Sequence, residues 1–260
     1  MKVSELGDGE PSVAVVAAVH GDEPCGVHAV EQLLDQQPDV HRPVKLVVAN
    51  ERALAQGVRY VDEDVNRAFP GDPEGETHEA RLAAELADEL AGCRTLALHS
   101  TQSHAEPFAV VDGVDSLVES VCPRLPIGAI VETGEYVEGR MFTAVEEVVE
   151  VECGLQGSET AAKNATRLVR EFLTAEGVLA GDAPARPVPA FRLTERVPKT
   201  VADEYEVFVP NFERVESGQP FAAADGDEQV ADEAFYPVLM SPYGYEDVFG
   251  YSAEKVGVVG

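Results

Sequence analysis

Residues 13–19 read VAVVAAV, an unbroken apolar run that is rich in β-branched side chains. Such a run is typical of a strand that is buried on both faces, as the strands of a parallel sheet are. The segment from Pro24 to Leu34 then predicts a helix with proline at its start, and the segment from Val44 to Ala49 predicts a second strand. This order of strand, loop, helix and strand predicts an α/β fold.

The same organisation continues up to about residue 180. Thr77 caps a predicted helix that ends at Gly92, and Ser158 caps another that runs to about Glu176. Strands are predicted at residues 95–98, directly before His99, and at residues 145–151, directly before Glu152. The sequence therefore predicts a mixed, mostly parallel sheet that is flanked by helices.

The character of the sequence changes after Leu179. The segment GDAPARPVPAF is rich in proline and predicts a linker. The following runs FRLTERV, YEVFVP and FYPVLM are short, β-like and separated by turns. We therefore predict two domains, an α/β domain over residues 1–180 and a small β-rich domain over residues 181–260.

The charge of the chain restricts its partners. With 48 acidic and 19 basic residues, its formal net charge is -29, which argues against nucleic acid as a partner because phosphate neutralisation needs a basic surface. The acidic residues are spread along the whole chain, a pattern that suggests a protein adapted to high salt. No apolar stretch approaches the roughly 18 residues of a membrane helix, and no secretory signal precedes the first strand. We expect a cytoplasmic protein without a membrane partner; the sequence leaves open a homo-oligomer.

Three residues at predicted strand ends suggest a metal site. His20 and Glu23 lie in the segment HGDEPCG, directly after the first buried strand, and His99 follows another. The carboxyl ends of neighbouring strands in such sheets meet at one edge, where binding sites form. Two histidines and a glutamate suit a catalytic Zn²⁺ ion, which takes three protein ligands and leaves one position for water. The sequence therefore predicts one zinc ion per chain.

The segment NERALAQGVRYVDEDVNRAFPGD follows this motif. Together they resemble the aspartoacylase and succinylglutamate desuccinylase family, which has a zinc carboxypeptidase-like fold. The resemblance covers roughly residues 13–175 strongly and the C-terminal part, with the segment YPVLMSPYGYED, more weakly. The later segment VECGLQGS is similar to the region of the family's catalytic glutamate. The residues that carry the resemblance in these two segments are Arg59, Tyr60, Asp64, Asn66, Arg67, Phe69, Glu152, Cys153 and Gly154.

The resemblance implies a role for each matching residue. Glu152 would be the general base, although Glu146, Glu147 and Glu150 are nearby alternatives without the glycine motif. Arg59 would share the negative charge that develops on the substrate oxygen. The remaining assignments place Asn66 and Arg67 at the substrate carboxylate, with Tyr245, or alternatively Tyr243, in the pocket.

Two features of the motif segments leave questions open. Asp64 either supports an arginine or caps the turn before Asn66. Family members often carry an Asp-x-His triplet at the third zinc ligand, whereas this chain has Ala97, Leu98 and His99. A carboxylate that would orient the metal-bound histidine is therefore missing from its usual place.

The function that the resemblance implies is zinc-dependent hydrolysis of the amide bond of an N-acyl amino acid, a small anionic substrate. One alternative is a zinc carboxypeptidase that acts on short peptides, because the same metal site and arginines could hold a C-terminal carboxylate. A second alternative is a binding protein that keeps the fold without turnover.

Overall fold

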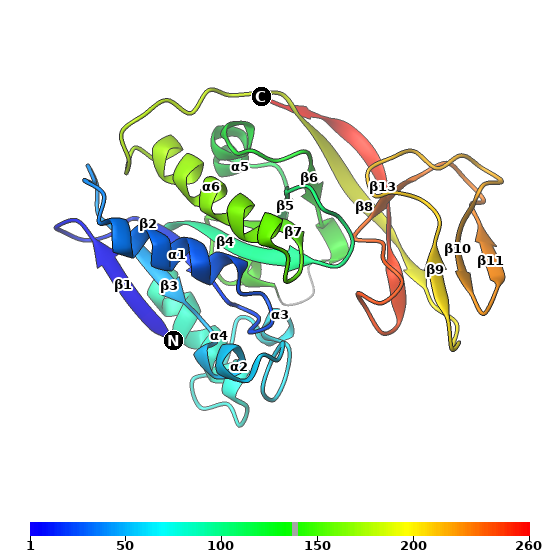
Figure 1. The fold of residues 1–260 in the computed structure, drawn as a ribbon, viewed down its shortest axis with the longest axis horizontal. Helices are drawn as coiled ribbons and strands as arrows, with labels where there is room; N and C mark the ends of the chain where they lie inside the picture. Colours follow the sequence, from blue (N-terminus) through cyan, green and yellow to red (C-terminus); the bar gives the residue numbers. More distant parts are fainter. Residues whose placement is uncertain (137–139) are drawn as a thin grey trace.

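The structure, a computed structural model, describes residues 1–136 and 140–260. It contains a large sheet and a small one, with helices on both faces of the large sheet (Figure 1). The strands of the large sheet are β1 (Lys2–Leu6), β2 (Val13–Ala17), β3 (Val44–Val48), β4 (Arg94–Thr101), β5 (Phe108–Val111), β6 (Ile130–Glu132), β7 (Val148–Leu155), β8 (Val188–Pro198), β12 (Tyr236–Val238) and β13 (Val248–Val259). The small sheet consists of β9 (Tyr205–Val207), β10 (Pro220–Ala224) and β11 (Asp227–Val230).

The helices come mostly from the first two thirds of the chain. The α-helices are α1 (Cys25–Gln36), α2 (Glu51–Gln56), α3 (Val65–Ala68), α4 (His78–Leu90), α5 (Ser116–Val121) and α6 (Glu159–Ala175). Short 3₁₀ turns are η1 (Cys122–Arg124), η2 (Gly134–Tyr136) and η3 (Met141–Thr143). The predicted caps are confirmed, because Thr77 Oγ1 accepts from the amide of Ala80 at 3.1 Å and Ser158 Oγ accepts from the amide of Ala161 at 3.1 Å.

The large sheet has the order β1-β3-β2-β4-β7-β5-β6-β8-β13-β12. Neighbours from β3 to β7 pair in parallel, as do β5 with β6 and β6 with β8, while the remaining pairs are antiparallel. The predicted mixed, mostly parallel α/β sheet is therefore confirmed. Every residue of β2 is buried, as its continuous apolar sequence predicts.

Two apolar cores hold the helices against the sheet. On one face, α1 and α6 pack side by side (Figure 1), and Leu33 and Phe172 join Leu96 and Leu98 of β4 in the core. On the opposite face, α4 packs through Leu82, Leu86 and Leu90 against the side that also carries Ala97. Successive residues of a strand point to opposite faces. His99 therefore lies on the same face as Ala97.

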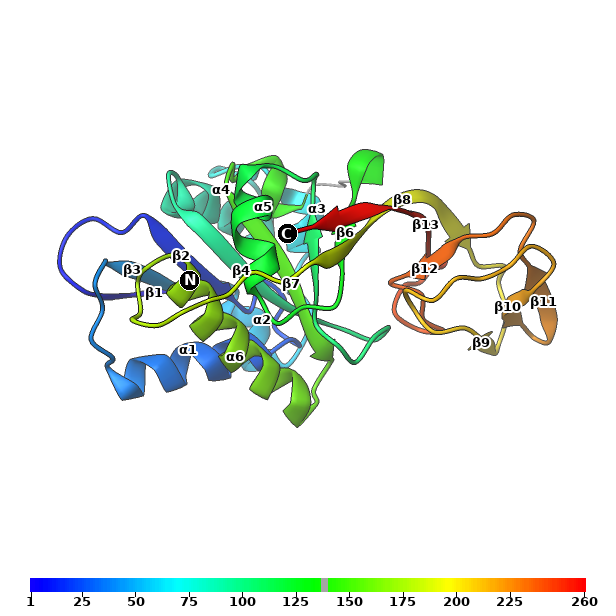
Figure 2. The same cartoon turned by 90° about the horizontal axis from the view of Figure 1, so that it is seen from above.

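The C-terminal part of the chain continues the large sheet. Strand β8 pairs in parallel with β6, and the 12-residue strand β13 pairs along β8. Beyond them the small sheet projects at one end of the molecule (Figure 2). The region is β-rich, but the division into domains at residue 180 stays a prediction. Within the described residues, no helix combines the length and apolar character that a membrane crossing requires.

We expect the melting temperature to rise with salt concentration. The 48 acidic side chains outnumber the 19 basic ones, so most carboxylates lack a cationic partner of their own and repel one another at low ionic strength. Screening shortens the range of this repulsion to a few ångströms at molar salt. Thermal unfolding between ~0.1 M and ~2 M potassium chloride measures the effect. A melting temperature that stays flat or falls would contradict salt adaptation.

Candidate active site

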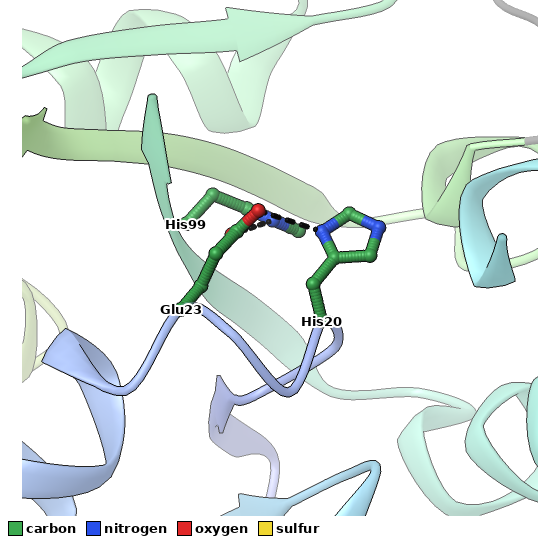
Figure 3. A group of neighbouring side chains, drawn as sticks. All are labelled: His20, Glu23 and His99. Atoms are coloured by element: carbon green, nitrogen blue, oxygen red, sulfur yellow. Dashed lines mark hydrogen bonds and ion pairs between the residues drawn. The ribbon is translucent and has the colours of Figure 1, made fainter. Parts of the chain in front are cut away.

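His20, Glu23 and His99 come together at the carboxyl edge of β2 and β4 (Figure 3). One Glu23 oxygen lies 3.0 Å from His20 Nδ1 and the other lies 3.0 Å from His99 Nδ1. All three side chains are buried, and their potential ligand atoms lie within 4.8 Å of one another. His20 and Glu23 come from the loop between β2 and α1, whereas His99 lies within β4, which continues to Thr101.

The loop that carries His20 depends on close backbone packing. A Cβ atom at Gly21 would lie 2.1 Å from the carbonyl carbon of Ala53 in α2, so no other residue fits there without a shift of the backbone. The Gly21 amide donates to the carbonyl of Arg59 at 3.0 Å. The loop with two metal-site residues and the segment with Arg59 are therefore held together through the backbone.

The three side chains fit a single metal ion. Imidazole nitrogens and a carboxylate oxygen are the donors of catalytic zinc sites. Burial raises the pKa of Glu23, yet His20 and His99 together hold this pKa well below its usual range. Burial also lowers the pKa of His99, but its hydrogen bond to Glu23 raises that pKa to about 9. The negative charge of the buried Glu23 therefore favours the binding of a cation between the two imidazoles.

Asp64 connects the metal site to the rest of the pocket. Its Oδ1 lies 3.0 Å from His20 Nε2 and accepts from the Asn66 amide at 2.8 Å, and its Oδ2 accepts from Arg59 Nε at 3.0 Å. Asp64 thus supports an arginine and caps α3, the two roles that the sequence left open. It also orients His20, which the sequence did not predict.

A cavity of about 120 Å³ opens beside these residues. It brings together the residues predicted for catalysis and substrate binding. Tyr245 lines it, whereas Tyr243 does not and is 61% exposed. The cavity is lined by His20, Glu23, Arg59, Asp64, Asn66, Arg67, His99, Ser100, Thr101, Gln102, Ser103, Arg140, Glu152, Gln156, Leu239, Ser241, Gly244 and Tyr245.

Glu152 faces this cavity from β7. It pairs in register with His99 on β4, and its Oε2 is buried without a hydrogen-bond partner in the described part of the chain. Burial, together with the charge of Glu23, raises the pKa of Glu152 to about 7. The glycine of the Glu-Cys-Gly motif has a positive φ of 127°, and a Cβ there would lie 2.6 Å from the Ala105 carbonyl oxygen. Gly154 is therefore needed where β7 passes the neighbouring loop.

Asn66 and Arg67 lie on the short helix α3. The Asn66 side chain is 4% exposed, and its Oδ1 has no hydrogen-bond partner among the described residues. Arg67 Nη1 donates to the Asn66 carbonyl at 2.9 Å. Arg59 donates to Glu23 at 2.9 Å, so the predicted oxyanion partner lies directly beside the metal site.

Arg140 and Glu79 are two residues with a role around the site that the sequence did not indicate. Arg140 lines the cavity and donates to Glu150 at 2.8 Å. Glu79, which is fully buried, accepts from the amides of Val61 and Asp62 at 2.7 and 3.0 Å. It thereby fixes the loop between Arg59 and Asp64. No motif spacing connects these residues to the site, since only tertiary packing brings them there.

Comparisons with known proteins agree with this geometry. A profile of the succinylglutamate desuccinylase/aspartoacylase catalytic domain matches residues 9–122. An N-acyl-aromatic-L-amino acid amidohydrolase (carboxylate-forming) of Mus musculus is 34% identical over 113 residues, which are 35% of this chain and 34% of that protein. A succinylglutamate desuccinylase of Idiomarina loihiensis is 28% identical over 76 residues, which are 28% of this chain and 22% of that protein. The matched segments thus cover about a third or less of these relatives.

The fold extends the similarity over nearly the whole chain. A succinylglutamate desuccinylase/aspartoacylase structure from Rhodobacter sphaeroides superposes with a TM-score of 0.79 at 18% identity, covering 97% of this chain and 89% of that one. The sheet and its flanking helices therefore define a zinc carboxypeptidase-like fold. Within this class, residues 9–122 are similar to the catalytic domain of the succinylglutamate desuccinylase/aspartoacylase family.

Proposed function

We propose that this protein is a zinc-dependent amidohydrolase that removes the acyl group from an N-acyl amino acid. The observation that carries the proposal is the position of Glu152, which lines the same cavity as the His20, Glu23 and His99 cluster and has a carboxylate oxygen without a partner in the described residues. The relatives named N-acyl-aromatic-L-amino acid amidohydrolase and succinylglutamate desuccinylase support the same reaction class.

His20, Glu23 and His99 would hold the zinc ion. When bound, zinc supplies a Lewis acid that polarises a carbonyl oxygen and lowers the pKa of water toward about 7. Glu152 then takes the proton of the attacking water, and its raised pKa of about 7 suits proton exchange near neutral pH. The same carboxyl group afterwards delivers the proton to the leaving amine.

Arg59 stabilises the negative charge that develops on the carbonyl oxygen. Its guanidinium lines the cavity beside Glu23, where a fixed cation contributes electrostatic stabilisation of the transition state. Burial acts to lower the pKa of Arg59, but Glu23 and Asp64 raise it, so the side chain keeps its charge. Tyr245 lies in the same cavity, and its desolvated surroundings raise the pKa of the phenol, which therefore remains a hydrogen-bond donor.

Asn66 and Arg67 bind the carboxylate of the amino acid. A guanidinium can offer two parallel donors to a carboxylate. The side-chain amide of Asn66, the neighbouring residue, can add an N–H donor. A cavity of about 120 Å³ favours a small acylated amino acid over a longer peptide, so deacylation is preferred to carboxypeptidase activity.

A panel of N-acyl amino acids tests the proposal. The purified protein would be loaded with zinc and incubated with acetyl, succinyl and aromatic acyl derivatives, and the released primary amine would be measured. Short peptides with a free C-terminus form the comparison set. Release of amine from acylated amino acids supports deacylation, whereas turnover confined to peptides, or absent throughout, contradicts it.

Replacing Arg67 by lysine is expected to weaken substrate binding. Arg67→Lys keeps the positive charge but loses the two-point geometry, so we expect KM to rise about tenfold, a change equivalent to the ~1.4 kcal/mol of one lost hydrogen bond to a charged group. The wild type should also discriminate against a substrate whose carboxylate is a methyl ester, and the variant should do so much less. Arg167→Lys is the matched control, because Arg167 is an exposed residue of α6. Equal discrimination in Arg67→Lys and wild type would exclude Arg67 as the anchor.

A further inference from the structure

Several buried polar atoms around the metal site lack hydrogen-bond partners in the described residues. Two of them are Nε2 of His99 and Oε1 of Glu150. The two residues are 4% and 1% exposed, respectively. One atom belongs to a ring that can donate and the other is a carboxylate acceptor. Buried groups of these kinds are normally satisfied, directly or through an ordered water.

The sheet places these two side chains on one face. Strands β4 and β7 are parallel neighbours, with Ala97 opposite Glu150 and His99 opposite Glu152. Because side chains alternate along a strand, all four point to the same face. The intervening residues confirm this alternation, since they belong to the apolar core on the opposite face: Leu96, Leu98, Val149 and Val151. Glu150 is therefore one diagonal step from His99, within reach of a long side chain.

The other oxygen of Glu150 is already fixed. Its Oε2 accepts from Arg140 Nη1 at 2.8 Å, in an ion pair whose side chains are only 2% and 13% exposed. The residue directly opposite Glu150 on β4 is Ala97, whose small side chain takes up little of this face. Glu150 does not line the substrate cavity, whereas Glu152, which also has a carboxylate oxygen without a partner in the described residues, does.

The two histidines of the metal site differ in one respect. His20 has its Nδ1 toward Glu23 and its Nε2 against the carboxylate of Asp64, at 3.0 Å each. His99 has its Nδ1 toward Glu23 in the same way, but its Nε2 has no partner among the described residues. Metal-bound histidines usually donate their second N–H to a carboxylate, a carbonyl or a water. A partner for His99 is therefore the missing part of the site.

We propose that Glu150 is a positioning residue that orients His99 for metal binding, by accepting a hydrogen bond from Nε2 directly or through one buried water. Glu150, on β7, would then do what the aspartate of an Asp-x-His triplet does in other proteins. This chain has Ala97 of β4 in the place of that aspartate. The inference rests on the proposed zinc site, and it adds a residue that contacts neither the substrate nor the metal.

Metal affinity, measured by competition with a chromophoric chelator, tests this proposal without reference to turnover. Glu150→Gln leaves one acceptor oxygen in place of two. That oxygen can accept from Arg140 or from His99, but not from both in the way that the two carboxylate oxygens can. We expect zinc affinity to fall about 10- to 100-fold, the usual effect of losing such a partner. Glu132→Gln is the matched control, because Glu132 is also buried and paired with an arginine, Arg192, at 2.7 Å. Its zinc affinity should equal that of the wild type.

Three further variants separate the explanations. Ala97→Asp in the Glu150→Gln background returns a carboxylate to the same face and should restore part of the affinity. Arg140→Gln removes the ion pair but leaves Glu150 as an acceptor, so it should not weaken zinc binding. Glu150→Asp keeps the charge on a shorter side chain and replaces Glu150→Gln if that variant does not fold, with a smaller loss expected.

The outcomes are distinguishable. Unchanged zinc affinity in Glu150→Gln, or an equal loss in Arg140→Gln, would overturn the role of Glu150 while leaving the zinc site in place. Absence of zinc binding in the wild type would instead overturn the proposed function, and this inference with it.

Discussion

Glu152→Gln is expected to lower kcat by about 10²- to 10⁴-fold, the contribution typical of a general base. Glutamine has nearly the same shape as glutamate but cannot accept a proton from water. Because Glu152 lies within β7 and its Oε2 makes no hydrogen bond within the described residues, the substitution should leave the fold and the metal site intact. Steady-state kinetics, with zinc content and substrate affinity measured in parallel, provide the comparison.

The control for this experiment is Glu147→Gln. Glu147 lies five residues before Glu152 and is exposed, so its replacement should leave turnover unchanged. Nearly full activity of Glu152→Gln would refute the assignment of the base. A loss of zinc together with activity would show that the substitution disturbs the metal site, and the kinetic result would then not identify a base.

Removal of both histidines from the metal site should abolish zinc binding and hydrolysis together. A protein with His20→Ala and His99→Ala keeps only Glu23 of the three buried donors, and one carboxylate does not hold zinc in a site of this kind. Elemental analysis should find one zinc per chain in the wild type and none in the double variant. The exposed His28 on α1 offers the control, because His28→Ala should retain the metal. Full zinc retention in the double variant would rule out the site.

The sequence predicted those parts of the fold whose signal is local. The buried run of β2 and the caps Thr77 and Ser158 depend on residues within a few positions, and the structure has them as expected. The strand at β13 was not predicted, although it has 12 residues. Its neighbour β8 is about 50 residues away in the chain, and a strand stabilised by such a distant partner has little signal of its own.

The same distinction applies to the site. His20, Glu23 and His99 could be named because each lies at or near the end of a predictable buried strand. The choice of Tyr245 over Tyr243 as a lining residue required the structure, because both lie in one irregular segment. Arg140 and Glu79 were not found, since their positions follow from contacts across the sheet and with a distant loop.

Asp64 gives the pocket a shared anchor, and this has a thermodynamic consequence. One carboxylate contacts His20, Arg59 and the first turn of the helix that carries Arg67. Any ligand that fixes the ring of His20 also restricts Asp64, and thereby the arginines that we propose meet the substrate. Occupancy of the metal position and affinity for the amino acid carboxylate should then be coupled, and by the reciprocity of linked equilibria each should strengthen the other by the same factor.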